Sequence, residues 1–268
     1  MKLTSLAVVI SFIAVLLFAT ACWRKSPEHI GFSHLGPPVT LPKHVSHADV
    51  EPAAEKDSAV IVILPATEQY YVGADQFPKE EVGEKVSRLL AGTAEASRIV
   101  YIRAGYFLDY GQVAKVIDSL RKVGVSRIGL SVESAAGAGG PSVLRLQIPP
   151  EPNENDDLSK LKPNPLTLVV SISKDLKLKL NQELVGNLDE PTKLTQMLSD
   201  VLQKRKEQHV YKPGMETRND VSEDERVEKT VVVKAQRSTR YADVVRLIDA
   251  VKGAGANPIV LQIDDLSD

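Results

Sequence analysis

Four histidines lie close together in the sequence near the N-terminus, at His29, His34, His44 and His47. Imidazole is a common ligand of zinc and copper, and a metal site needs several such groups to converge on one ion. The stretch that carries these histidines is interrupted by prolines and shows no period of 2 or 3.6 residues, so the pattern indicates neither a helix nor a hairpin that would bring the rings together. We interpret them as solvated linker residues and predict no metal site.

Carboxylates are the next candidates for chemistry, and Asp118 and Asp249 are the most suggestive of them. Each abuts an apolar stripe on a predicted helix, where a carboxylate is usually solvated or paired with a neighbour such as Arg121 or Lys122. Hydrolysis needs a nucleophile beside a base, whereas the body of the chain has one histidine, His209, and no G-x-S-x-G motif. We predict that the protein is not an enzyme, and we assign no catalytic and no cofactor-binding residue.

The N-terminal segment contains the single cysteine of the chain, Cys22, which excludes an internal disulfide and a metal cage of cysteines. No charged residue occurs between Leu3 and Ala21, and about 20 apolar residues suffice to span a bilayer. An alternative reading takes Leu6 to Phe18 as the core of a signal peptide, followed by Ala19-Thr20-Ala21 and a candidate lipidated residue, Cys22, as in bacterial lipoproteins. Under both readings we expect residues 1–25 to tether an exported chain to a membrane.

The composition excludes one large class of partners. The chain has 268 residues, of which 43% are hydrophobic, enough for one or two ordinary cores. Lys and Arg number 33 against 35 Asp and Glu, so the formal net charge is -2 and no global positive field attracts phosphate backbones. Aromatic residues make up only 5%. We therefore expect no nucleic-acid partner.

The body of the chain contains an internal repeat. Residues 99–133 align without a gap to residues 230–264, at the constant offset of 131 positions that separates Tyr110 from Tyr241 (241 − 110). The identical pairs fall mostly on positions with structural meaning. They are Val100/Val231, Ala104/Ala235, Tyr110/Tyr241, Val113/Val244, Ile117/Ile248, Asp118/Asp249, Gly124/Gly255, Ile128/Ile259 and Leu130/Leu261.

Each copy predicts the order β-β-α-β-α-β. Short apolar runs predict strands, apolar residues at i, i+3, i+4 and i+7 predict helices with one buried stripe, and the glycines after those stripes predict helix ends. Pro78 and Pro191 fit the first turn of the first helix in each copy. Right-handed crossovers would then place both helices on one face of a small sheet.

The predicted fold class is α+β, with two related small domains at residues 59–135 and 166–268 after an N-terminal membrane helix or lipoprotein signal. A linker rich in proline and histidine, residues 26–58, reads as an extended and poorly ordered spacer. A second linker, residues 136–165, is rich in glycine and proline. The second copy carries a charged insertion near residues 208–229, which we expect to be a mobile loop.

Two features are candidates for binding a partner. Val143 to Ile148 alternates strictly and predicts an added edge strand, so Leu144 and Leu146 are candidate contacts for a partner chain. Tyr110 and Tyr241 recur at the start of each second helix, where we expect the ring to pack and the hydroxyl to reach the surface. Peptidoglycan or an envelope protein is a candidate ligand there.

The first copy resembles the periplasmic domain of the ExbD/TolR family of biopolymer transport proteins, and the second copy resembles it more faintly. The matching segments are Arg103-Ala104, Asp109-Tyr110-Gly111-Gln112-Val113, Val116-Ile117-Asp118, Val123-Gly124-Val125 and Ile128-Gly129-Leu130. The resemblance implies a domain that lies outside a single membrane helix, dimerises, and works beside an ExbB/TolQ-like membrane protein in a proton-driven motor. With two copies in one chain, the dimer is either a homodimer or an internal pseudo-dimer.

Two departures from the family pattern change the expected role. Family members carry a proton-accepting acidic residue in the membrane helix, and the segment from Leu3 to Ala21 has none. The family also often has Asp after the strand-ending Ala, where this chain has Gly105 and Gln236. We expect a component of the bacterial inner membrane with its bulk in the periplasm, which acts by binding protein or cell wall. The alternatives are a lipid-anchored envelope lipoprotein outside any motor and, third, a small enzyme.

Overall fold

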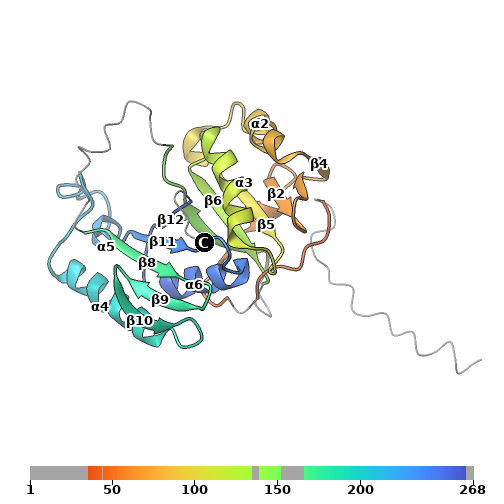
Figure 1. Cartoon of the computed structure of the whole chain (residues 1–268). Coiled ribbons are helices and arrows are strands. Elements are labelled where there is room, and N and C mark those ends of the chain that lie inside the picture. Colours follow the sequence, from red (N-terminus) through yellow and green to blue (C-terminus); the bar gives the residue numbers. More distant parts are fainter. Residues whose placement is uncertain (1–35, 44, 135–138, 152–165, 264–268) are drawn as a thin grey trace, which may run out of the picture. The chain divides into compact units, whose positions relative to one another are not determined.

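The computed structural model of this protein describes residues 36–43, 45–134, 139–151 and 166–263 (Figure 1). The predicted anchor, residues 1–25 with Cys22, lies outside the described residues, as do His29, His34 and His44. Within the described ranges, no helix combines the length and the apolar character needed to cross a membrane.

The two copies have the same order of elements, as the repeat predicts. The first copy runs β2 (Val60–Leu64), β3 (Tyr70–Val72), β4 (Asp75–Phe77), α2 (Lys79–Leu89), η2 (Glu95–Ser97), β5 (Val100–Ala104), α3 (Tyr110–Lys122) and β6 (Arg127–Val132). The second runs β8 (Leu168–Ile172), β9 (Lys177–Leu180), β10 (Glu183–Asn187), α4 (Thr192–Glu207), α5 (Glu223–Arg226), β11 (Val231–Ala235), α6 (Tyr241–Gly253) and β12 (Ile259–Leu261).

Each copy has one strand more than we predicted, because β4 follows β3 and β10 follows β9. Both pairs are antiparallel hairpins with very short turns. Gly73 at φ 62° and Asn181 at φ 56° occupy these turns, and Gly and Asn are the residues that best tolerate a left-handed backbone. Gly73 and Asn181 were thus the features of the sequence from which the hairpins to β4 and β10 could have been predicted.

The two copies share a single sheet, so the prediction of two separate small sheets is wrong. Among the described residues the strand order is β10-β9-β8-β11-β12-β7-β6-β5-β2-β3-β4. The connecting strand β7 (Ser142–Gln147) joins the halves: it pairs antiparallel along β6 and meets β12 in parallel at Gln147 and Val260. Buried side chains of α2, α3, α4 and α6 belong to one core, so helices of both copies cover the same face of this sheet (Figure 1).

The N-terminal linker is not a spacer where the structure describes it. We call residues 36–43 and 45–55 the strap; it includes β1 (Asp49–Val50) and the short helix η1 (Pro52–Glu55). Val39 and Ala54 of the strap pack against Ile61, Ile63 and Tyr101 on the sheet face opposite the helices. The strap therefore supplies a second apolar layer to the first copy.

The insertion of the second copy carries regular structure rather than forming an open loop. The helix α5 begins with a capping box, in which Ser222 and Glu225 satisfy each other's backbone N–H groups. The buried guanidinium of Arg205 on α4 donates to the carbonyl oxygens of Glu228, at 2.9 Å, and Leu166. These contacts fasten the end of the insertion to α4 and to the residues before β8.

Candidate functional site

The junction between the copies is built from reciprocal main-chain hydrogen bonds. Tyr110 N donates to Thr239 O at 2.8 Å, and Tyr241 N donates to Leu108 O at 2.7 Å. These bonds are related by the repeat offset, since 241 − 110 and 239 − 108 are both 131. The segment before α3 therefore contacts the segment before α6 in the way that identical subunits meet across a twofold axis.

A second symmetric pair extends the junction. Gly111 N donates to Arg237 O at 2.9 Å, and Ala242 N donates to Tyr106 O at 3.1 Å, again at the offset of 131 (242 − 111 and 237 − 106). These four donors belong to the first residues of α3 and α6. The first N–H groups of a helix have no partner within the helix, so each copy satisfies the free donors of the other.

Tyr110 and Tyr241 are buried at this junction, with exposed fractions of 1% and 0%. The expectation that their hydroxyls reach the surface is therefore wrong. The hydroxyl of Tyr110 donates to Gln262 O at 3.0 Å, whereas that of Tyr241 has no hydrogen-bond partner among the described residues. Burial raises the pKa of both phenols well above the ordinary value of 10.0, so both are neutral at physiological pH.

Leu144 and Leu146 lie on β7, which forms as predicted but is not an edge strand. Their exposed fractions are 0% and 3%, and both belong to the core beneath the helices. One side of β7 is covered by β6, and the other by β12 and β1. As the structure is arranged, these two side chains hold the copies together and are not presented to a partner.

Asp118 and Asp249 occupy equivalent helix positions but have different partners. Asp118 binds Arg121 and Lys122 on its own helix, as the sequence predicts, and these cations lower the pKa of its carboxyl against the opposing effect of burial. The Asp249 carboxylate instead accepts the N–H groups of Ser46 at 3.1 Å and His47 at 2.6 Å. At this position, the carboxylate of the second copy binds the strap, whereas the carboxylate of the first copy binds side chains of its own helix.

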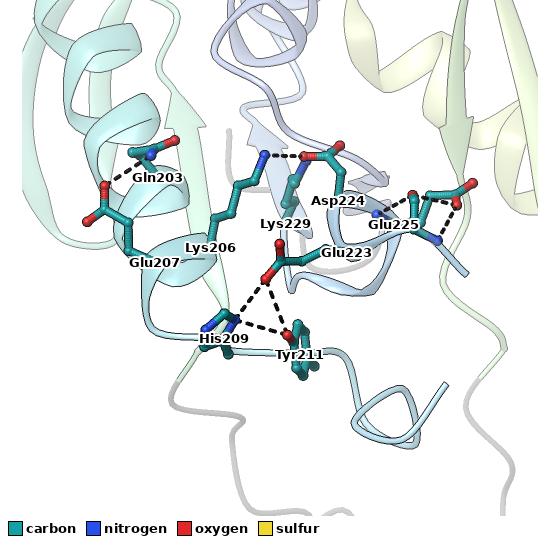
Figure 2. Close-up of polar contacts among 10 residues, drawn as sticks. Gln203, Lys206, Glu207, His209, Tyr211, Glu223, Asp224, Glu225 and Lys229 are labelled. Carbon is teal, nitrogen blue, oxygen red and sulfur yellow. Dashed lines mark hydrogen bonds and ion pairs between the residues drawn. The ribbon is translucent and has the colours of Figure 1, made fainter. Parts of the chain in front are cut away.

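The insertion forms a polar surface beside the end of α4 (Figure 2). His209 Nδ1 lies 2.8 Å from Glu223 Oε1 and 3.0 Å from the Tyr211 hydroxyl. Nearby, Asp224 binds Lys229 at 2.6 Å and Lys206 at 3.4 Å, and Lys229 is the main cause of the lowered pKa of this carboxyl. Sequence reasoning missed this cluster, because its members come from the end of α4 and from both ends of the insertion.

These contacts hold segments of the chain together. In the described part of the chain, no three side chains of His, Cys, Asp or Glu are grouped so that they could hold a metal ion. His47 and Asp249 do lie side by side, with Nδ1 3.3 Å from Oδ2, but both serve to hold the strap. What the geometry offers is an interface between two related units and a strap that crosses it.

Comparison with known proteins gives one consistent result. The family model described as "Biopolymer transport protein ExbD/TolR" matches the chain twice, over residues 1–135 and 138–266. The biopolymer transport protein ExbD of Neisseria gonorrhoeae is 34% identical over 100 residues, which are 37% of this chain and 69% of that protein. The ExbD protein of Pseudomonas putida is 30% identical over 88 residues, or 32% of this chain and 61% of that protein.

Proposed function

Since this chain belongs to the ExbD/TolR family of biopolymer transport proteins, we propose that it is the membrane-anchored, periplasm-facing component of an ExbB/ExbD-like or TolQ/TolR-like complex. The observation that carries the proposal is the double family match within one chain. In this role the protein binds an ExbB/TolQ-like membrane protein through residues 1–25 and binds protein or cell wall through the folded body. It has no catalytic role.

One chain supplies both family domains in this proposal. Support comes from the reciprocal bonds at the junction, where Tyr110 and Tyr241 donate to Thr239 and Leu108. The donors and acceptors that a homodimer would use between subunits are here engaged within the chain. One N-terminal segment would then serve two periplasmic domains, and Tyr110, Tyr241, Leu144 and Leu146 would act by holding those domains in position.

The protein does not itself carry the proton in this proposal. A proton relay within a membrane needs an ionisable side chain, and the segment from Leu3 to Ala21 contains no charged residue. The central polar residue of that segment is Ser11. We expect Ser11→Ala to retain full transport activity. Loss of activity in a chain that still fractionates with the membrane would contradict this part of the proposal.

Co-purification tests the proposal as a whole. The full chain, extracted in mild detergent, should retain an ExbB/TolQ-like protein. Native mass spectrometry should find one copy of this chain, with its two family domains, in each complex. A matched chain that lacks residues 1–25 should lose this partner. Recovery of the full chain without any such partner would refute the proposed complex.

The alternative of an envelope lipoprotein rests on the small residues Ala19-Thr20-Ala21 before Cys22. Mass spectrometry of the mature N-terminus separates the two. A chain that begins at a lipid-modified Cys22 supports the lipoprotein, and an intact chain that begins at Met1 supports the transmembrane anchor. The Cys22→Ser variant should change membrane association only in the first case.

A further inference from the structure

One side chain of the second copy, Asp249, accepts two main-chain N–H groups of the strap. Both oxygens of Asp249 on α6 lie 3.1 Å from Ser46 N, and Oδ1 also accepts the N–H of His47 at 2.6 Å. The side chain of Asp249 is only 10% exposed. Hydrogen bonds to a charged acceptor are among the strong ones, so this carboxylate is the main polar attachment of the strap to α6.

The first copy shows what this position does when no strap is bound. At the repeat offset of 131, Asp118 corresponds to Asp249 (249 − 118) and Lys122 corresponds to Gly253 (253 − 122). Lys122 Nζ lies 3.0 Å from Asp118 and occupies its carboxylate. A lysine at position 253 would be able to do the same, but the chain has glycine there, which leaves Asp249 available for main-chain N–H groups.

Glycine at 253 also makes room for the strap. A Cβ atom at this position would lie 2.5 Å from Cε1 of the His47 ring, closer than real Cβ contacts. The residue before it, Lys252, binds Asp49 of the strap at 2.5 Å. Asp249, Lys252 and Gly253, on one stretch of α6, thus all contribute to contact with the same segment.

The strap crosses from one copy to the other. Before residue 44, Thr40 O accepts from Tyr106 N at 3.0 Å and Pro42 O accepts from Glu133 N at 2.9 Å, both in the first copy. After it, β1 pairs with the end of β7, with Asp49 opposite Val143 and Val50 opposite Ser142. This strand of two residues covers β7 on the side where β12 pairs only at Gln147.

Residues 45–51 also have contacts away from α6. The buried Glu51 binds Arg145 through its carboxylate and donates its N–H to Pro141 O at 2.8 Å, and Val45 and Ala48 pack against the core. The side chains of His47 and Asp49 are 50% and 42% exposed, and Val50 is 49% exposed. Exposed ion pairs contribute little to stability. A two-residue strand also contributes few hydrogen bonds. On the second copy, Ser46 and His47 therefore depend on the Asp249 carboxylate for their attachment.

We propose that residues 45–51 are an intramolecular ligand of the second copy, and that Asp249 and Gly253 form its binding site. The bound segment acts as a latch that covers the end of β7 at Ser142 and Val143.

Hydrogen exchange tests the latch in the full chain in mild detergent. Mass spectrometry of a peptide that contains residues 45–51 should show protected amides in the natural protein. Asp249→Asn should accelerate exchange of the Ser46 and His47 amides roughly ten- to a hundredfold, the loss expected for hydrogen bonds to a charged acceptor. Gly253→Lys should do the same, because it recreates the arrangement of the first copy. Asp118→Asn is the matched control and should leave the strap protected.

Protection of β11 in each variant serves as the internal measure of folding. If Asp249→Asn and Gly253→Lys leave residues 45–51 as protected as in the natural protein, the proposal is wrong. It is also wrong if Asp118→Asn releases the strap to the same extent, because the site would then not belong to the second copy.

A second experiment tests the site with a ligand added in trans. The variant His47→Pro removes the N–H that lies 2.6 Å from Asp249, and it should release the strap. A fluorescent peptide with the sequence of residues 45–51 should then bind this variant, as measured by anisotropy, and should not bind the double variant with Asp249→Asn. Equal binding to both, binding to neither, or a strap that stays protected in His47→Pro would each overturn the proposal.

Discussion

The two junction tyrosines provide a matched pair of variants, Tyr110→Phe and Tyr241→Phe. Each change removes one hydroxyl oxygen from a ring that is at most 1% exposed and leaves the ring in place. The surroundings of the rings are related by the repeat, but their hydroxyls differ. Tyr110 donates to Gln262 O at 3.0 Å, and Tyr241 has no partner for its hydroxyl in the part of the chain that the structure describes.

The two variants should differ in their effect on stability. A typical intramolecular hydrogen bond contributes about 0.5–1.5 kcal/mol net, so Tyr110→Phe should lower the free energy of unfolding by about 1 kcal/mol. A buried polar group without a partner costs about 1–3 kcal/mol in desolvation. Tyr241→Phe removes that cost, so it should leave the free energy of unfolding unchanged or raise it by about 1 kcal/mol or more.

Urea denaturation of the chain from residue 34 onward measures both, because residues 34–268 form one compact unit. The midpoints should differ between the variants at an unchanged m value, which shows that stability rather than the unfolded state has changed. If Tyr241→Phe destabilises the protein as much as Tyr110→Phe, the two hydroxyls are equally satisfied, and the asymmetry described for the junction is wrong.

Three further predictions concern buried residues. Burial raises the folded-state pKa of Tyr110 and Tyr241 above the ordinary 10.0, so the folded state retains protons that the unfolded state loses. The contribution of these tyrosines to stability should be constant below about pH 10 and fall above it, so in a urea series against pH the fall should be less steep in the Tyr110→Phe/Tyr241→Phe double variant. Leu146 in β7 is 3% exposed, so Leu146→Ala should lower the free energy of unfolding by about 2–5 kcal/mol. Leu184 in β10 is 55% exposed, so Leu184→Ala should change it by less than about 0.5 kcal/mol. Equal losses of stability in thermal unfolding would contradict the internal position of β7. Gly129→Ala would place a Cβ atom 2.8 Å from the Tyr101 ring and should lower the free energy of unfolding by about 1–3 kcal/mol. Gly139→Ala is the control and should be tolerated, because open space surrounds that position. The reverse order of the urea midpoints would refute the packing of β6 against the Tyr101 ring.

The repeat predicted the order of elements well, because periodicity and helix ends are local properties of the sequence. The stripe of Val113, Val116, Ile117 and Leu120 is buried on α3, and Gly124 after it adopts φ 81°. Pairing between the copies was not predictable in the same way. An offset of 131 shows that two segments fold alike, but it does not show which of their edges meet.

The tyrosine prediction failed for a related reason. A residue at the start of a helix usually lies near the surface, so the hydroxyls of Tyr110 and Tyr241 were expected there. At the junction, however, the starts of α3 and α6 face each other and exchange hydrogen bonds, which buries both rings. No local pattern distinguishes a helix start in solvent from one that meets its own repeat.

The strap did leave a signal in the sequence, in the strands that it covers. In β8, Leu168, Val170 and Ile172 are buried while Val169 and Ser171 are partly exposed, as expected for a sheet with helices on one face only. The corresponding strand β2, Val60–Leu64, is apolar and buried at every position. A strand without alternation requires cover on both faces, and the helices of the first copy supply only one. The apolar sequence of β2 therefore required a second covering layer, which the alternating strand β8 does not need. The strap, the segment that precedes β2 in the chain, supplies that layer.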